Sequence, residues 1–380
     1  MAPPSLIVDV HTHVYPSSYI ALLRSRKTVP YVYDPPSGAD PRLIILATDD
    51  DPSRPQELRG RPLDAAYSSW DAKRSFMKLH GINVSVVSLA NPWLDFLEDP
   101  EEAAGWARRV NDDLEEVCRE SNARNHGEGV CKLYAFAALP LKASSEAVEA
   151  EIGRCKGLNY IKGIIMGTTG LGKGLDDPAL EPIWNALQKN KMTVFLHPHY
   201  GLPDEAFGGK EIVAQSGHVL PLALGFPLET TIAVARMFLA GVFDRYGSLE
   251  MLLAHSGGTL PFLAGRIQSC VDHEREFKQN GGHKQGPVKG IWDVLKTNIY
   301  LDAVIYGDIG LKAAIGASKS TDRVLFGTDH PFFPPLHSAD EKWPSVTTNY
   351  AAINAGVGDG SEEAKDILGR NALKILDIDL

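Results

Sequence analysis

The stretch LIVDVHTH, residues 6–13, decides the fold class of this chain of 380 residues. Its first five residues are mostly β-branched and apolar, as in a buried strand, and two histidines follow directly. Alternate residues of an extended chain point to the same side, so His11 and His13 are expected to face the same way. A buried strand that runs into a pair of imidazoles indicates a sheet with a functional site at the carboxyl ends of its strands.

Similar apolar runs recur along the chain and alternate with longer amphipathic stretches, which is the pattern of repeated strand–helix units. The predicted strands cover residues 6–10, 84–89, 133–138, 160–165, 193–196, 249–254, 299–301 and 324–326. The predicted helices include residues 69–80, 100–125, 144–155, 228–242 and 260–279. Because a closed α/β barrel needs eight such strands, we predict a (β/α)8 TIM barrel.

The composition is that of an ordinary globular protein, with 44% hydrophobic and 23% charged residues, and the length fits one barrel domain over residues 1–380. The formal net charge of −10 is spread along the chain, which argues against nucleic acid and anionic membranes as partners and favours a small molecule. The sequence shows neither a basic, apolar leader nor an uninterrupted apolar segment of membrane-spanning length, so we expect a cytoplasmic protein. The four cysteines lack CxxC spacing and are expected to be reduced thiols.

Two segments break the alternation of strands and helices. Residues 23–62 are rich in Pro, Asp and Arg, with short apolar runs at 31–33 and 43–46. They predict an insertion after the first strand, a small hairpin that covers the barrel mouth. The second segment, residues 198–221, follows the fifth strand and predicts a loop at the site, long enough for His218 to reach the pocket.

Residues that follow the carboxyl ends of barrel strands converge on one face of the barrel. In this chain His197 follows the fifth predicted strand, His255 the sixth and Asp329 the eighth. Three imidazoles and a carboxylate form a set that suits zinc or a similar divalent ion, with a further position for water or substrate. We therefore predict that His11, His13, His197 and Asp329 bind one metal ion. His255 is either a further ligand or a group that holds substrate and assists proton transfer.

Five motifs together resemble the decarboxylase branch of the amidohydrolase superfamily, the relatives of aminocarboxymuconate semialdehyde decarboxylase. They are VDVHTHVYP (8–16), FLHPH (195–199), GFPLETTIAVARM (225–237), HSGGTLPFLAGR (255–266) and FGTDHPF (326–332). The resemblance covers nearly the whole chain and implies a metal-dependent carboxy-lyase. Superfamily members with two metals usually carry a bridging lysine at the end of strand four, where this chain has IIMG (164–167), and Lys162 comes too early. A mononuclear site is therefore expected.

Two further segments, RGRPLDAAYSSW (59–70) and SLANPW (88–93), are similar to the isoorotate decarboxylases within this branch. This resemblance implies that carbon dioxide is removed from 5-carboxyuracil to give uracil, the last step in thymine salvage. It also implies one zinc ion per subunit, although the ligand types alone also allow manganese or cobalt. The assembly that it implies is a homodimer or homotetramer.

The residues suggest roles in such a reaction. Asp329 is the candidate acid that delivers a proton to the ring carbon. An anionic substrate also needs a fixed counter-charge, and the guanidinium groups of Arg61 and Arg266 are the candidates. The resemblance implies that Arg266 enters the pocket of the neighbouring subunit. Asn91 is placed to bond the pyrimidine edge, and Phe332 to form an apolar wall.

Other functions fit the same ligands. One is decarboxylation of a hydroxybenzoate such as resorcylate or carboxyvanillate, and another is hydrolysis of a lactone or amide by water that the ion activates. A third is a barrel that has lost catalysis and serves as a scaffold. Metal content and turnover of a panel of substrates distinguish these alternatives.

Overall fold

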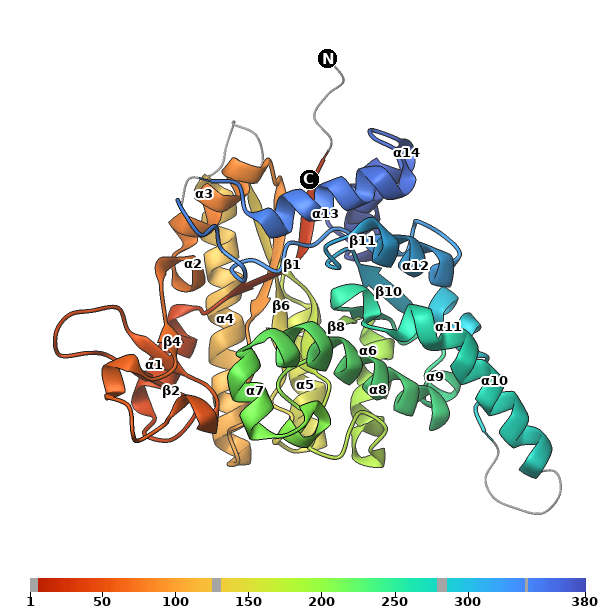
Figure 1. Ribbon diagram of the computed structural model, residues 1–380, viewed down its shortest axis with the longest axis horizontal. Coiled ribbons are helices and arrows are strands. Elements are labelled where there is room, and N and C mark those ends of the chain that lie inside the picture. The colour runs from red at the N-terminus through yellow and green to blue at the C-terminus, as the bar shows by residue number, and fades with distance from the viewer. Residues whose placement is uncertain (1–5, 125–130, 279–285, 339–340) are drawn as a thin grey trace.

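The computed structural model describes residues 6–124, 131–278, 286–338 and 341–380. Eight parallel strands form one sheet in the order β1-β5-β6-β7-β8-β9-β10-β11, and helices surround it (Figure 1). The strands are β1 Val8–Val14, β5 Val84–Leu89, β6 Lys132–Ala138, β7 Ile161–Gly167, β8 Thr193–His197, β9 Met251–Leu253, β10 Ile299–Asp302 and β11 Val324–Leu325. The predicted TIM barrel is confirmed.

The two end strands of the sheet meet and almost close the barrel. The amide of Val10 donates to the carbonyl of Phe326 at 3.0 Å, and the amide of His13 donates to that of His330 at 2.7 Å. A parallel bridge also joins Thr12 to His330. The closure therefore places the histidine pair of β1 beside the segment that follows β11.

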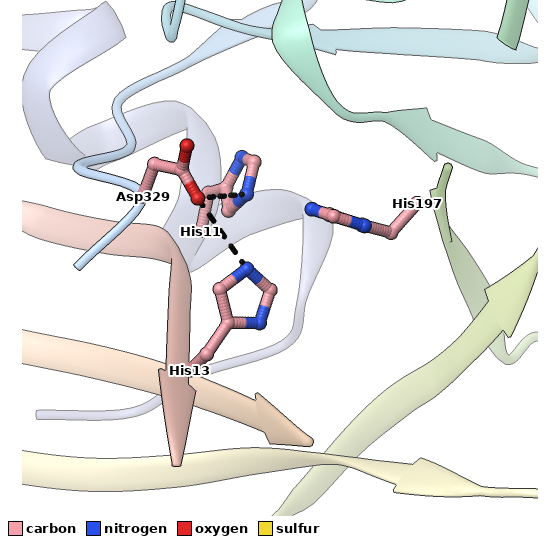
Figure 2. A group of neighbouring side chains, drawn as sticks. All are labelled: His11, His13, His197 and Asp329. Carbon is pink, nitrogen blue, oxygen red and sulfur yellow. Dashed lines mark ion pairs between the residues drawn. The ribbon is translucent and has the colours of Figure 1, made fainter. Parts of the chain in front are cut away.

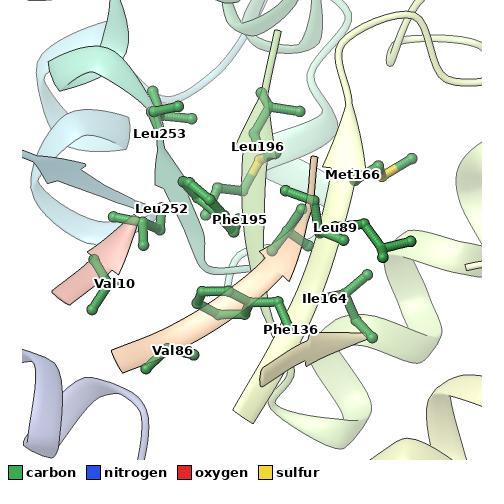
Figure 3. Close-up of a cluster of buried hydrophobic side chains, with 14 of the residues drawn as sticks. Val10, Val86, Leu89, Phe136, Ile164, Met166, Phe195, Leu196, Leu252 and Leu253 are labelled. Carbon is green, nitrogen blue, oxygen red and sulfur yellow. The ribbon is translucent and has the colours of Figure 1, made fainter. Parts of the chain in front are cut away.

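The barrel core is built from side chains of successive strands. Val10, Val86, Phe136, Ile164 and Phe195 are buried there and lie in one cluster (Figure 3). Strands that are buried on both faces carry near-continuous apolar runs, which is why the sequence pattern marks them clearly.

Helices cover the sheet. The main ones are α1 Ser17–Ser25, α3 Trp70–His80, α4 Pro100–Arg124, α5 Ser145–Lys156, α6 Glu181–Asn190, α8 Phe226–Leu239, α10 Leu260–Lys278, α12 Asp308–Ser318 and α13 Pro344–Val357. Five of them, α3, α4, α5, α8 and α10, correspond to the predicted amphipathic stretches. The limits of α3 have a local cause: the Ser69 hydroxyl caps its first turn by accepting from the Ala72 amide, and Gly81 ends it with a φ of 68°. The predicted terminal residues Asn125 and Gln279 lie outside the described residues.

The first strand is longer than the predicted residues 6–10. Strand β1 continues to Val14 because it pairs with β5 along its whole second half, with His13 opposite Ser88 and Val14 opposite Leu89. His11 and His13 therefore lie within the strand rather than after it. Their direction is set by the sheet, which holds a side chain more firmly than a loop does.

The insertion after β1 is a three-stranded antiparallel sheet and not the predicted two-stranded hairpin. Its strands are β2 Tyr31–Tyr33, β3 Arg42–Ile44 and β4 Arg61–Pro62, in the order β2-β3-β4 (Figure 1). Strand β4 has two residues and contains proline, so it carries no apolar alternation that a sequence pattern can reveal. Its pairing with β3 fixes the position of Arg61.

One helical stretch of the described chain, Leu220–Leu239, is long and apolar enough to cross a membrane by length and composition alone, although Glu229 and Arg236 interrupt its apolar sequence. Half of the stretch is buried inside the protein. It consists of a π-helical segment, η5 Leu220–Gly225, followed by α8. The buried side of α8 includes Thr230, Val234 and Met237, as expected for a helix that packs on a barrel.

Candidate metal centre and substrate pocket

The four predicted ligands lie together at the carboxyl ends of the strands. One ligand atom from each of His11, His13, His197 and Asp329 lies within 4.8 Å of the others, and all four residues are buried (Figure 2). Two come from β1, one from the end of β8 and one from the turn after β11. Barrel closure is what joins the first and last parts of the chain at this point.

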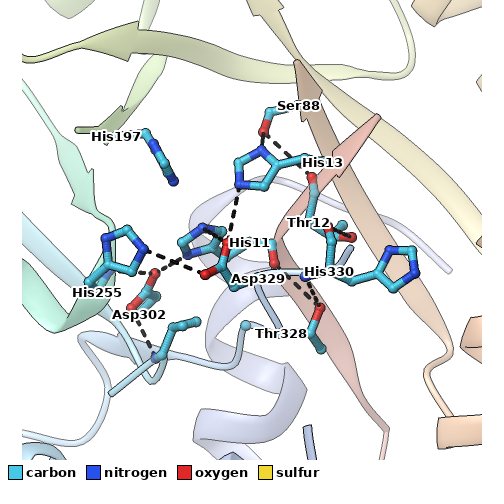
Figure 4. Close-up of polar contacts among 12 residues, drawn as sticks. His11, Thr12, His13, Ser88, His197, His255, Asp302, Thr328, Asp329 and His330 are labelled. Carbon is cyan, nitrogen blue, oxygen red and sulfur yellow. Dashed lines mark hydrogen bonds and ion pairs between the residues drawn. The ribbon is translucent and has the colours of Figure 1, made fainter. Parts of the chain in front are cut away.

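Each histidine of the cluster uses its Nδ1 atom for a contact with a neighbouring oxygen. The pairs are His11 with Asp302 Oδ2 at 2.5 Å and His13 with Ser88 Oγ at 3.1 Å (Figure 4), and His197 with Pro198 O at 2.6 Å. The Nε2 atoms of all three rings are buried and make no hydrogen bond. Buried polar atoms normally have a partner, and histidine ligands normally hold their second nitrogen in this way. The residues therefore fit a divalent metal ion bound through the three Nε2 atoms.

Asp329 supplies the negative charge of the cluster. Its Oδ1 atom lies 3.3 Å from His11 Nε2 and 3.6 Å from His13 Nε2. Burial tends to raise the pKa of Asp329, but the imidazoles of His11, His13 and His255 outweigh it and hold this pKa well below its usual range. The residue thus presents a carboxylate, as a metal ligand must.

The three imidazoles differ in proton affinity. Burial tends to lower the pKa of His11, but the carboxylates of Asp329 and Asp302 raise it to about 10. Burial lowers the pKa of His13 to about 4 and that of His197 well below its ordinary value. The two carboxylates therefore make the site favourable for a positive charge, which a bound divalent ion would supply in place of the proton on His11.

Asp302 contacts the candidate centre through His11 and was not among the residues predicted for the site. Besides its contact with His11, its carboxylate accepts hydrogen bonds from the backbone amides of His255, Ser256 and Val304 at 2.8–3.1 Å. Asp302 follows the seventh predicted strand directly, so the rule that singled out His197 and His255 also points to this residue.

His255 lies beside the ligand cluster and is not part of it. Its Nε2 atom is 3.7 Å from Asp329 Oδ2, and its ring centroid is 5.1 Å from those of His11 and His197. Its Nδ1 atom is buried and makes no hydrogen bond. The geometry agrees with a group that faces both the substrate pocket and the carboxylate of Asp329.

A cavity of about 420 Å³ lies next to the cluster. Its lining includes residues that the sequence singled out, namely Asn91, His218, His255, Asp329 and Phe332. Most of the remaining wall is apolar or aromatic. A largely apolar cavity of this size with a few polar groups suits a small ring compound.

Arg61 lies next to this cavity, against the ring of Phe332. Its guanidinium carbon is 5.4 Å from the centre of that ring and 5.1 Å from the centre of the Tyr67 ring, and its Nη2 donates to the Tyr15 hydroxyl at 3.3 Å. Its Nε atom is buried without a hydrogen-bond partner, and among the described residues it makes no ion pair. Arg59, by contrast, pairs with Asp50 at 2.8 Å. Arg61 is thus a cation with donor capacity to spare.

Arg266 does not reach the metal pocket of its own chain. It is an exposed residue of α10 and lines a different cavity, between α8 and α10. The predicted contact with a neighbouring subunit concerns a second chain and stays a prediction.

Two further residues, Lys162 and His330, have structural surroundings. Lys162 donates to the carbonyl of Asp377 at 2.8 Å and belongs to no metal cluster of the described residues. His330 is buried and lies 2.6 Å from the Lys73 amine, through its Nδ1 atom. Neither residue contributes to the candidate centre.

A parallel barrel that gathers three imidazoles and one carboxylate at the carboxyl ends of its strands is a metalloenzyme of the TIM-barrel class. The amidohydrolase family model matches residues 8–378, and the chain belongs to this family.

The chain is 49% identical to IDCase (isoorotate decarboxylase) of Metarhizium anisopliae, whose crystal structure superposes with a TM-score of 0.87 and covers 98% of this chain and 97% of that one. It is 27% identical to 2-amino-3-carboxymuconate-6-semialdehyde decarboxylase of Dictyostelium discoideum, over 99% of this chain and 92% of the relative. The structure of 5-carboxyvanillate decarboxylase from Novosphingobium aromaticivorans, solved with manganese, shares the fold at 20% identity, with a TM-score of 0.74 and coverage of 99% and 97%. The chain is therefore a metal-dependent decarboxylase of the amidohydrolase superfamily.

Proposed function

We propose that the protein decarboxylates 5-carboxyuracil (isoorotate) to uracil and carbon dioxide. The observation that carries the proposal is the 49% identity to Metarhizium IDCase over almost the whole of both chains. The pocket supports it, because an unpaired arginine beside an apolar cavity suits a planar ring with a negative charge. In a cell, this reaction would complete the salvage of thymine.

A divalent ion held by His11, His13, His197 and Asp329 would supply Lewis-acid stabilisation of an anionic substrate. Phe332 bounds the pocket and keeps the ring in plane. Asn91 and Arg61 bond the uracil edge and the negative charge of the substrate. These contacts fix the ring carbon that carries the carboxylate next to Asp329.

The reaction replaces the carboxylate of the ring by a proton. Asp329 delivers a proton to the ring carbon; the carbon–carbon bond then breaks, its electron pair returns to the ring and carbon dioxide leaves. Because the low pKa of Asp329 keeps it ionised at rest, it must gain this proton after the substrate binds. His255, with Nε2 at 3.7 Å from Asp329 Oδ2, is the neighbour that can pass the proton on.

The direct test is chromatographic detection of uracil after the metal-loaded protein is incubated with 5-carboxyuracil. Resorcylate, carboxyvanillate and simple lactones serve as the comparison panel. Formation of uracil supports the proposal. No uracil, together with turnover of a hydroxybenzoate, would replace the pyrimidine by a phenolic acid as the substrate.

Replacement of Arg61 by methionine is expected to raise KM for 5-carboxyuracil by about 10- to 100-fold, because a charge-assisted hydrogen bond contributes about 1.5–3 kcal/mol. Arg59→Met is the matched control, since Arg59 is two positions away and pairs with Asp50 instead of facing the pocket. Steady-state kinetics of both variants measure the difference. Equal KM values for the two variants would remove Arg61 from the substrate site.

We also propose that the protein forms a dimer through α8 and the start of α10. Exposed apolar side chains gather there: Leu228, Ile232 and Leu239 on α8, Leu224 on the preceding η5 segment, and Phe262 on α10. Apolar stripes of this kind on a protein surface mark contacts between chains. Arg266 lies one turn beyond Phe262 on the same helix, which suits its predicted entry into the partner's pocket.

The double substitution Ile232→Glu and Phe262→Glu is expected to produce monomers, because two buried unpaired charges oppose association. Light scattering after size exclusion measures the mass, and Ile309→Glu, at an exposed apolar residue of α12, is the control.

Mixing Arg266→Ala with Asp329→Asn chains tests whether Arg266 of one chain enters the pocket of the other. Activity should return in mixed dimers, where one pocket has both native groups; no recovery would place Arg266 outside catalysis.

We place zinc in the site as the native ion, with manganese as the alternative that the carboxyvanillate relative contains. Elemental analysis of protein purified without added metal tests the identity of the ion.

We also propose that the protein is located in the cytoplasm. Fractionation of the producing cells tests this location.

A further inference from the structure

Tyr306 contacts the metal-site carboxylate from the pocket side. Its hydroxyl donates a hydrogen bond to Asp329 Oδ2 at 3.2 Å. The other oxygen of the same carboxylate, Oδ1, faces His11 and His13. The two oxygens of Asp329 thus have separate surroundings: one belongs to the ligand cluster, and the other belongs to Tyr306 and His255.

The surrounding structure holds Tyr306 in place. Its φ angle is 56°, a left-handed conformation that is costly for a bulky residue and persists only where neighbours fix it. Its amide donates to Asn349 Oδ1 at 3.1 Å, and Asn349 Nδ2 donates to the carbonyl of Gly327 at 3.2 Å. Asn349 belongs to α13 and is fully buried. A single side chain therefore links the loop of Tyr306 to the turn that carries Asp329.

The ring of Tyr306 is part of the wall of the substrate cavity. It packs edge-on against Phe333, with ring centroids 5.7 Å apart. The ring can therefore keep its position when the hydroxyl is removed. This separates the packing role of the residue from its hydrogen bond to Asp329.

We propose that Tyr306 is a positioning residue that holds Asp329 Oδ2 toward the substrate and leaves Oδ1 for the metal. Its hydroxyl prevents the carboxylate from rotating, so that the oxygen that delivers the proton stays on the pocket side. The expected effect on kcat rests on the proposed decarboxylation. The orientation of the carboxylate does not depend on which acid is the substrate.

The test compares Tyr306→Phe with Tyr134→Phe, whose hydroxyl bonds the carbonyl of Asp379, outside the candidate centre. Both variants are loaded with cobalt(II), whose visible absorption reports the geometry of its ligands. The kinetics are measured with whichever acid the wild type decarboxylates. For Tyr306→Phe we expect kcat to fall by about 10- to 100-fold, the loss of a hydrogen bond to a charged group, with KM nearly unchanged.

We also expect Tyr306→Phe to bind one ion per chain with an altered cobalt spectrum, while Tyr134→Phe matches the wild type in kcat and spectrum. A Tyr306→Phe variant with an unchanged spectrum, or with unchanged kcat, would overturn the proposal. If the wild type acts on no acid in the panel, the proposed function fails on its own. The cobalt spectra still decide whether Tyr306 orients Asp329.

Discussion

Asp329→Asn is expected to lower the rate of decarboxylation by about 10³-fold, since proton transfer by a well-placed acid contributes about 10²- to 10⁴-fold. The substitution keeps the shape of the side chain and removes both its charge and its exchangeable acid proton. The three imidazoles stay in place through Asp302, Ser88 and the carbonyl of Pro198. The loss is therefore expected in kcat first. Product formation under saturating substrate, with metal content measured in parallel, checks it.

The control for this experiment is Asp308→Asn. Asp308 is an exposed residue at the start of α12 and pairs with Lys312 at 2.7 Å. It should keep wild-type kinetics, because exposed ion pairs contribute little to structure. If Asp329→Asn retains more than about a tenth of the wild-type rate, Asp329 is not the acid, since that loss is below the range for general acid catalysis.

Removal of the metal is expected to abolish activity and to lower the free energy of unfolding. The three Nε2 atoms, which make no hydrogen bond, and the carboxylate of Asp329 lose the cation that they would hold. A ligand present at a hundred times its Kd stabilises the folded state by about 2.7 kcal/mol. The free energy of unfolding of the chelated protein should therefore be lower by about this amount. Activity and denaturant unfolding are measured after dialysis against a chelator and again after zinc or manganese is added back.

His197→Gln should reproduce the effect of the chelator and resist rescue by added ion, because glutamine cannot offer the imidazole Nε2. The exposed His337→Gln is the matched control and should respond to chelation as the wild type does. Full activity after exhaustive chelation would remove the metal from the mechanism.

Much of the fold could be predicted because its signals are local. Apolar β-branched runs such as residues 84–89 define strands by period and length, and β5 is observed with these bounds. Ser69 and Gly81 mark the limits of α3 through hydrogen bonds and a φ angle that involve only near neighbours. The third strand of the insertion was not predicted, because two residues are too few to show a hydrophobic alternation. They pair with β3 only through tertiary contact.

The sequence by itself determined the barrel and the four candidate ligands, because strands and the residues at their carboxyl ends are defined by local order along the chain. Only the tertiary structure decided which atoms of these ligands are free. The Nδ1 of His11 is held by Asp302, which is 291 positions away, and Asp329 is oriented by Tyr306. Arg61 becomes an unpaired cation beside Phe332 through the sheet of the insertion. Such contacts arise from barrel closure and packing, and no local pattern encodes them.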